Sequence, residues 1–475
     1  MKKTAVLCFL AILFAAACAI NPVTGKRELA LISEQGEIEM GKETDAQISR
    51  EYGYYVDAEL TQYVASIGAT LTPHTHRPNL AYHFAVLDTP VVNAFAAPGG
   101  YIYVTRGILA LMNSESELAV VLGHELGHVA ARHSVRQMST QILVTVGLAV
   151  GSIVSEKFAK WAGVAGLGAQ LLFLKFSRDD ERQADALGVQ YARAGRFNSG
   201  EMVKFFSSLQ RYGDMSGGHS LPGFLSTHPL TSERIQNVKA MLGENDVALP
   251  AKREEYLGRI DDIVYGDDPR QGYVEGGAFY HPGMRFAFAI PQGWKIQNTP
   301  AQVTMADAEG NAAVLLRAEK SAEDLSAYIK KQAASIEGGQ FVTEQSELVN
   351  GLAAHHGIYN IPQQNQGALR ARFTCIRKND FIYTFSQLSQ AVDFNHFDPT
   401  FRQVFASFGE LRDARYLNRQ PRHLRIVKAD GQRPYKDYLS QAGLKKEELT
   451  TLTILNELKD AETAPERGRM IKVVR

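Results

Sequence analysis

The stretch that most constrains the fold of this 475-residue chain is 114–135, which reads SESELAVVLGHELGHVAARHSV. Ser114 followed by Glu117 has the pattern of a capping box, so the sequence predicts a helix that begins here. Aliphatic residues supply one apolar face, so the helix is expected to pack inside a domain. His124 and His128 lie about 40° apart around such a helix, so both imidazoles leave it on the same face.

This histidine pair indicates a metal site. Two neutral imidazoles at this spacing can share one zinc ion, with Glu125 beside them as a general base. The alternative is a helix with surface histidines. The apolar surroundings weaken that alternative, because a buried histidine pair without metal would need other polar partners.

A catalytic zinc needs a third protein ligand and an open position for water. The segment 177–185, SRDDERQAD, begins another strongly helical run, which is expected to end at Gly195. Glu181 and Asp185 are again four residues apart, so one carboxylate can reach the metal while the other orients a ligand histidine. An acidic first turn favoured by the helix dipole is the competing explanation, and it accounts better for the earlier acidic residues than for Asp185.

Four ordered motifs together resemble a known family. HELGH is followed by SRDDERQADALG and by Thr227-His228-Pro229 with Arg234, and the chain opens its mature part with NPVTGKRELALIS. Over about residues 21–240 the chain resembles the zinc metallopeptidases of the HtpX/BepA-like family, which includes the CAAX prenyl endopeptidase. The stretch 93–107 fits the lipoprotein branch of that family.

The resemblance implies a mainly α-helical, zincin-type (gluzincin) metallopeptidase domain with a small sheet, over residues 19–265. It also implies roles for single residues. One Zn²⁺ per chain would be bound by His124, His128 and Glu181. Glu125 would be the general base, Asp185 its acidic neighbour that orients a ligand or handles a proton, and His228 would approach the metal or the developing oxyanion.

Residues 1–18 have the pattern of a lipoprotein signal peptide. Two lysines precede a short apolar run, and three alanines precede Cys18. The signal resembles a bacterial lipobox, which implies a lipid anchor at Cys18 and a periplasmic, outer-membrane-anchored protein. Ordinary cleavage after a small-residue site is the alternative.

The second half of the chain changes style. Residues 266–280 are Gly-rich and are expected to form a linker. Residues 281–415 combine alternating strand patterns with two helix candidates, near 322–334 and 395–407, so an α+β domain is predicted, and it weakly resembles PsbP-like domains. Residues 422–475 resemble a small βααβ LysM-like module. Its usual Gly-Asp-Thr is absent, so a peptidoglycan partner and an envelope-protein or packing partner are equal readings.

Three smaller predictions concern the surroundings of the site. Residues 100–105 alternate in character and are expected to be an edge strand for substrate, a plain core strand, or both. His133 lies about 140° from His128 if the helix continues, so it is expected to be structural. The apolar runs within 142–176 are each too short to span a bilayer, which favours a lid or buried helices over a membrane-dipping hairpin.

These features predict a multidomain zinc metalloendopeptidase that acts on misfolded or misassembled envelope proteins in an extended conformation. A non-proteolytic assembly factor or chaperone with a structural zinc is the alternative, and an integral membrane peptidase is a third. The 51 basic and 51 acidic side chains balance, which argues against a nucleic-acid partner.

Overall fold

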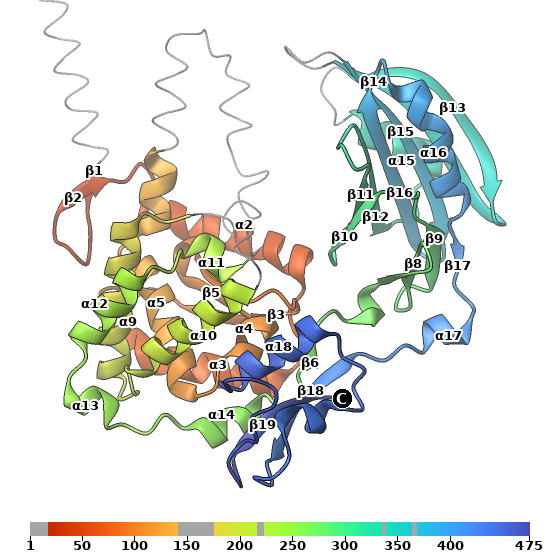
Figure 1. The fold of residues 1–475 in the computed structure, drawn as a ribbon. Coiled ribbons are helices and arrows are strands. Elements are labelled where there is room, and N and C mark those ends of the chain that lie inside the picture. The colour runs from red at the N-terminus through yellow and green to blue at the C-terminus, as the bar shows by residue number, and fades with distance from the viewer. Residues whose placement is uncertain (1–17, 141–174, 216–222, 335–338, 363–367) are drawn as a thin grey trace, which may run out of the picture. The chain divides into compact units, whose positions relative to one another are not determined.

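The computed structural model describes residues 18–140, 175–215, 223–334, 339–362 and 368–475. Two compact units divide the chain (Figure 1). The first unit contains the described residues up to Ser49, residues 53–266 and residues 422–475, and the second contains 50–52 and 267–421. The signal-peptide prediction for residues 1–17 and most of the 142–176 prediction lie outside the described residues.

Helices make up most of the first unit. Before the histidine motif they are α2 (Glu34–Tyr52), α3 (Ala58–Leu71) and α4 (Arg106–Leu111). The motif lies on α5 (Glu115–Ala130). Later helices are α9 (Arg178–Ala194), α10 (Glu201–Met215), α11 (Phe224–Thr227), α12 (Ser232–Met241), α13 (Glu244–Val247), α14 (Arg253–Arg259) and α18 (Lys446–Leu455).

A small sheet lies beside the motif helix. Its strands are β3 (His83–Leu87), β4 (Ala94–Ala97) and β5 (Tyr101–Thr105), in the order β3-β5-β4. β3 runs parallel to β5 and β4 runs antiparallel to it. The segment 100–105 is therefore the central, wholly buried strand, and the edge-strand prediction for it was wrong. The edge beside α5 belongs to the shorter strand β4.

An N-terminal hairpin and the C-terminal tail also belong to the first unit. The hairpin pairs β1 (Cys18–Ile20) with β2 (Arg27–Leu29). The tail contributes β18 (Arg422–Lys428) and β19 (Met470–Val474), which form a sheet with β6 (Val264–Tyr265). A short 3₁₀ helix, Tyr435–Leu439, precedes α18 in the tail.

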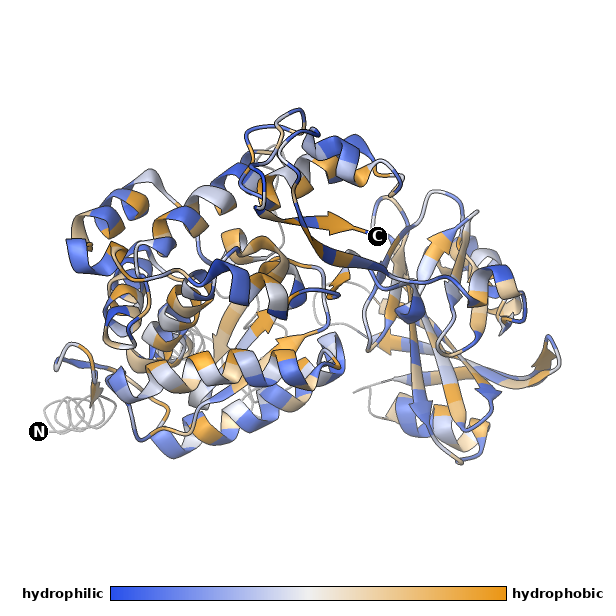
Figure 2. Ribbon diagram, turned by 90° about the horizontal axis from the view of Figure 1, so that it is seen from below, coloured by the Kyte–Doolittle hydropathy of each residue, from blue (hydrophilic) through white to orange (hydrophobic). Residues whose placement is uncertain are grey.

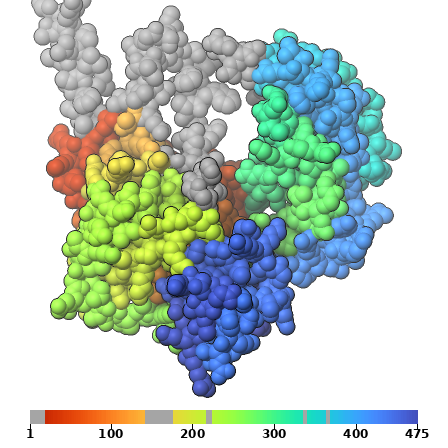
Figure 3. Space-filling view, viewed as in Figure 1, coloured from red at the N-terminus to blue at the C-terminus, as the bar shows by residue number. Residues whose placement is uncertain are grey.

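The tail shares the hydrophobic core of the first unit. Leu424, Leu452 and Val473 belong to the same buried cluster as the residues of α5 and α10. Figure 3 shows the blue tail packed directly against the yellow-green region around residue 200. β19 (MIKVV) is hydrophobic except at one position (Figure 2), and that lysine is buried. Residues 422–475 are thus folded onto the helical region rather than tethered to it.

The second unit is an α+β body. A seven-stranded antiparallel sheet has the order β10-β11-β12-β16-β15-β14-β13, and a four-stranded sheet has the order β17-β9-β8-β7. The large sheet uses β10 (Lys295–Asn298), β11 (Val303–Ala306), β12 (Ala312–Lys320), β13 (Gln340–Val349), β14 (Leu352–Pro362), β15 (Ala368–Lys378) and β16 (Phe381–Gln390). The small one uses β7 (Tyr273–Glu275), β8 (Ala278–His281), β9 (Phe286–Ala289) and β17 (Gly409–Glu410).

Both predicted helices of this unit are present, as α15 (Leu325–Ala334) and α16 (Phe394–Ala406), and a short α17 (Ala414–Leu417) follows them. α15 packs against Phe373 and Cys375, while α16 packs into a separate cluster with Ile376. Because neighbouring residues of a strand point to opposite faces, the two helices cover opposite faces of the sheet. The expected linker 266–280 is ordered here, since it holds β7 and the start of β8. Among the described residues, no helix combines the length and the apolar character that crossing a membrane requires.

Candidate metal centre

The two helices that carry the predicted ligands begin where the sequence indicated. Ser114 caps α5, and its hydroxyl accepts a hydrogen bond from the backbone N–H of Glu117 at 3.1 Å. The Glu117 carboxylate accepts from the N–H of Asn113 rather than from Ser114, so the capping box is not reciprocal. Ser177 and Asp180 form a complete capping box at the start of α9, which ends before Gly195 as predicted.

α5 and α9 cross with their backbones in contact. A Cβ atom on Gly188 of α9 would stand 3.0 Å from the backbone nitrogen of His124, and one on Gly123 would stand 3.0 Å from the carbonyl oxygen of Gly188. Only glycine allows an approach this close without displacement. The crossing brings the HELGH turn of α5 against the acidic first two turns of α9, so the ligand side chains of both helices point into one space.

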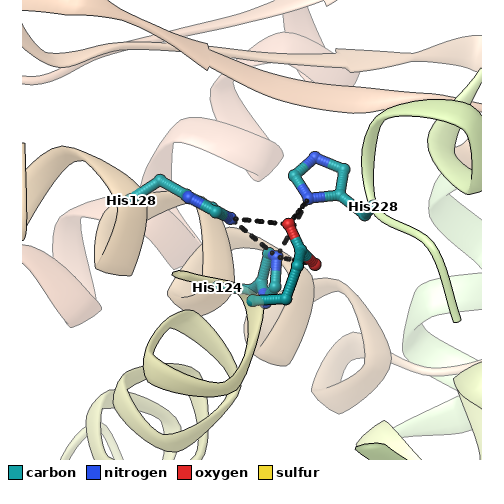
Figure 4. A group of neighbouring side chains, drawn as sticks. His124, His128 and His228 are labelled. Carbon is teal, nitrogen blue, oxygen red and sulfur yellow. Dashed lines mark hydrogen bonds and ion pairs between the residues drawn. The ribbon is translucent and has the colours of Figure 1, made fainter. Parts of the chain in front are cut away.

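Four buried side chains meet there (Figure 4). His124, His128, Glu181 and His228 each offer one donor atom, and these atoms lie within 4.8 Å of one another. His124 Nε2 is 3.1 Å from His128 Nε2 and 3.3 Å from His228 Nδ1. Glu181 Oε1 is 2.8 Å from His228 Nδ1 and 3.5 Å from His128 Nε2.

These spacings fit a metal ion. Donors placed about 2.0–2.1 Å from a tetrahedral zinc are about 3.3 Å from one another, which is close to the distances between these side chains. His228 enters this group through Nδ1, while its Nε2 faces Glu125 Oε1 at 3.7 Å. Three imidazoles and one carboxylate are donors of the kind that a zinc-type metal prefers. The residues present therefore fit a bound metal, and His228 belongs to the donor group.

Electrostatics favour the ligand forms of His128 and Glu181, whereas for His228 the effect of burial is outweighed by the carboxylates of Glu181 and Glu125, which raise its pKa. Burial lowers the pKa of His128 well below its ordinary value, and the neighbouring imidazoles lower it further, so this imidazole is neutral. Burial opposes ionisation of Glu181, but His228, His124 and Arg234 together hold the pKa of this carboxyl below its usual value. A neutral imidazole and an ionised carboxylate are the ligand forms of these groups.

Glu125 follows His124 on α5 and is fully buried. Burial raises the pKa of this carboxyl, while the charges of His228 and His124 act in the opposite direction. Its Oε1 lies 3.7 Å from His228 Nε2. The backbone N–H of Ala96, in the edge strand β4, also acts on this carboxyl and lowers its pKa. Glu125 thus sits between the donor group and the sheet edge, where a general base would be required.

Asp185 and Arg234 hold two of the donor side chains, His124 and Glu181, in position. Asp185 Oδ1 is 3.0 Å from His124 Nδ1, the ring nitrogen opposite the one in the donor group, so the carboxylate orients this ligand. Arg234 of α12 binds Asp185 through two nitrogens, at 2.7 and 2.6 Å, and Glu181 at 2.7 Å. Burial would raise the pKa of Asp185, but the hydrogen bonds from Arg234 and His124 lower it.

The sequence analysis did not foresee the contacts that three groups make around the site. Arg234 was part of the family motif, but its bonds to Glu181 and Asp185 of α9 follow only from the fold. The available signal was the pair of carboxylates on one helix, because buried carboxylates need a buried cation as partner. Phe176 stacks on the His128 ring with the ring centres 4.1 Å apart. His133 was expected to be merely structural, but its Nδ1 lies 2.8 Å from Nδ1 of His128. The expectation assumed a continuous helix, whereas α5 ends at Ala130 and Arg132 has a positive φ of 55°.

Comparison with known proteins agrees with this geometry. Residues 58–242 match the model of peptidase family M48. A beta-barrel assembly-enhancing protease of Yersinia pestis is 31% identical over 246 residues, which cover 50% of this chain and 50% of that protein. The mitochondrial metalloendopeptidase OMA1 of Arabidopsis thaliana is 31% identical over 39% of this chain and 36% of its own length. The chain thus spans about half or less of the length of these relatives.

A solved structure also resembles part of the chain at a low level. The solution structure of cyanobacterial PsbP from Synechocystis covers 29% of this chain and 98% of its own, with 12% identity and a TM-score of 0.25. A likeness this low supports no conclusion. The matched residues 58–242 include every donor, the general-base candidate and Arg234, so the similarity to peptidase family M48 spans the whole candidate site.

Proposed function

We propose that this chain is a zinc-dependent metalloendopeptidase that hydrolyses peptide bonds in misfolded or misassembled cell-envelope proteins. One observation carries the proposal: the side chains of His124, His128, Glu181 and His228 converge from three separate segments on one buried point, with Glu125 beside them. The names of the relatives, a beta-barrel assembly-enhancing protease among them, support the choice of envelope proteins as substrates.

The chemistry follows from the positions of the chain's own groups. A zinc ion in this site would supply Lewis-acid chemistry, activating a water molecule and polarising the scissile carbonyl. Glu125 would take the proton of the attacking water and pass it to the leaving amine, a task suited to a buried carboxyl with a raised pKa. Asp185 and Arg234 would hold His124 and Glu181 in place throughout.

His228 has two roles to reconcile. Catalytic zinc sites keep one position open for water, whereas four protein donors close a site. In this arrangement His228 lies among the donors, 2.8 Å from Glu181. We therefore propose that His228 occupies the fourth position until substrate arrives, and that it then donates a hydrogen bond to the developing oxyanion.

Substrate would bind as an extended chain along β4. This strand is one of the two edge strands of the small sheet, and it packs beside the helix that carries Glu125. Backbone pairing with an edge strand accepts many sequences, which suits a peptidase of unfolded proteins. We propose that the mature protein is held at the periplasmic face of the outer membrane by a lipid on Cys18, and that residues 422–475 contact an envelope partner.

The test compares the chain without residues 1–18 with its Glu125→Gln variant on a permanently unfolded protein. Both should bind one zinc per chain, but the wild type should cleave about 10²–10⁴-fold faster, because that is the contribution of a general base and its proton transfers. Glu115→Gln is the matched control, since Glu115 lies on the same helix but bonds Tyr63 and Lys252 instead. Equal cleavage by wild type and Glu125→Gln would refute the proposal.

A second function deserves a test because the donor group holds four side chains. Four protein ligands are typical of a structural zinc. The chain would then be a non-proteolytic assembly factor or chaperone. The two functions can be distinguished by expressing Glu125→Gln in cells that lack the protein. Restored growth under envelope stress would support the assembly factor, and failure to restore it would support the peptidase. Carbonate extraction of membranes from cells that express a Cys18→Ser variant tests the third alternative. Release of this variant into the soluble fraction would exclude an integral membrane peptidase.

A further inference from the structure

His128 has a partner on the side of its ring that faces away from the donor group. Its Nε2 lies among the donors, 3.1 Å from His124 Nε2, so its Nδ1 must carry the ring proton when Nε2 binds a metal. That Nδ1 is 2.8 Å from Nδ1 of His133. His133 is only 1% exposed, so water cannot readily take over this hydrogen bond. His133 Nδ1 must therefore accept a hydrogen bond from the Nδ1–H group of His128.

The acceptor role fixes the other nitrogen of His133. A neutral imidazole that accepts at Nδ1 donates at Nε2. His133 Nε2 lies 2.9 Å from Oε1 of Gln183 and 3.5 Å from Oδ1 of Asp180. Both partners lie on α9, the helix that supplies Glu181, so one directed chain of hydrogen bonds runs from a metal ligand on α5 to the first turns of α9.

The chain of contacts then continues to the N-terminal hairpin. Arg136 forms an ion pair with Asp180 and a second one with Glu28 of β2, at 3.0 Å. Glu28 also accepts a hydrogen bond at 2.9 Å from Asn21, whose amide donates to the carbonyl of Ala131 at 3.1 Å. The hairpin that begins at Cys18 is thus bonded to the turn at 131–132, which directly precedes the helical residue His133.

We propose that His133 is a positioning residue for His128, and that Arg136 ties this position to the N-terminal hairpin through Asp180 and Glu28. His124 is oriented by the carboxylate of Asp185. His128 is oriented by an imidazole that is itself held from α9 and from the hairpin. The inference rests on the metal centre of the proposed function, and its readout is zinc binding, which is independent of proteolysis.

The experiment measures zinc affinity by competition with a chromophoric chelator, and the visible spectrum of the cobalt-loaded protein, for the chain without residues 1–18. His133→Leu removes the acceptor and should weaken zinc binding about 10–100-fold, as loss of such partners generally does. His133→Asn places an oxygen where Nδ1 lies, so it should restore affinity to within about threefold of wild type and recover its cobalt spectrum.

Arg136→Met tests the link to the hairpin. It should weaken zinc binding measurably, and His133→Leu with Arg136→Met should be no weaker than His133→Leu alone, because both act through one path. Arg193→Met is the matched control: Arg193 lies on α9 and pairs with Asp246 at 2.6 Å, away from the donors, and its variant should bind zinc normally.

Separate outcomes overturn separate statements. A wild-type chain that binds no zinc removes the proposed metal centre itself. Wild-type zinc affinity and cobalt spectrum in His133→Leu, or equal weakening in His133→Leu and His133→Asn, would show that His133 only fills space. If His133→Leu does not fold, His133→Asn and Arg136→Met still decide: identical zinc binding by Arg136→Met and Arg193→Met would refute the link to the hairpin.

Discussion

The contact between α5 and α9 makes a sharp prediction for Gly188→Ala. Replacing a helical glycine by alanine normally stabilises a protein by up to about 1 kcal/mol. At this position, however, the new Cβ would lie 3.0 Å from the backbone nitrogen of His124 and 3.3 Å from the carbonyl oxygen of Val120. Both atoms belong to the backbone of a wholly buried helix and cannot swing aside. Overpacking of this kind costs about 1–3 kcal/mol, so the net effect is a loss of about 0–2 kcal/mol.

Gly258→Ala is the matched control, because Gly258 is an exposed residue of helix α14 and a Cβ added there would meet no atom within 4 Å. That variant should gain up to about 1 kcal/mol. Urea unfolding of both variants should therefore differ by about 1–3 kcal/mol. Gly188→Ala should also bind zinc more weakly, because α9 carries Glu181 and must move away from α5. Equal stabilisation by both substitutions, with unchanged zinc affinity, would refute the proposed packing.

Three further predictions concern the tail, the second unit and the metal. Lys472→Met should lower the free energy of unfolding, measured in urea, by about 2–4 kcal/mol. The reason is that the buried Lys472 Nζ donates to the carbonyls of Ala110, Met112 and Leu455 at 2.6–3.1 Å. An unchanged urea midpoint would contradict this prediction. Burial lowers the pKa of His281 to about 4, so stability that is complete above pH 6.5 should be lost as the pH falls toward 4. His281→Asn, which keeps an acceptor for the Met284 N–H, should reduce this acid loss by up to about 3 kcal/mol, measured by urea unfolding from pH 7 to 4.5. Removing the metal with a chelator should lower the thermal midpoint, and adding zinc back should restore it. Compared with protein in free zinc at 100 times Kd, the loss of stability should be about 2.7 kcal/mol.

Local signals in the sequence predicted the site better than its surroundings. Ser114, Ser177 and Gly195 marked the ends of the two ligand helices correctly because capping is a local interaction. The spacing of His124 and His128 placed both rings on one face, since the helix period is fixed. The resemblance to a peptidase family then brought Glu181 and His228 to the same centre, where the structure also places them.

The errors concern features that only the folded chain decides. Alternation in 100–105 indicated a strand, but the position of a strand within its sheet depends on which segments pair with it. The edge strand beside α5, Ala94–Ala97, is four residues long and too short to give a pattern. His133 was misplaced because Arg132 takes a positive φ, which no glycine or asparagine signalled.

The tail illustrates a different limit. A lysine within a strand usually indicates an exposed position, because an isolated buried charge is costly. Lys472 is nevertheless fully buried, since the ends of α4 and α18 present carbonyl oxygens to it, as a helix C-terminus favours a cation. Those partners lie far from Lys472 in the sequence, so the joint core of the tail and the helical region could not be foreseen.

The most direct test of the central claim is elemental analysis of zinc in the purified chain and in two variants prepared in parallel. We expect about one zinc per chain in the wild type and in Glu125→Gln, and almost none in His124→Ala, because Glu125 acts beside the metal while His124 binds it. Zinc retained at the wild-type level by His124→Ala, or absent from a folded wild type supplied with zinc, would contradict the assignment of this buried cluster as the metal centre.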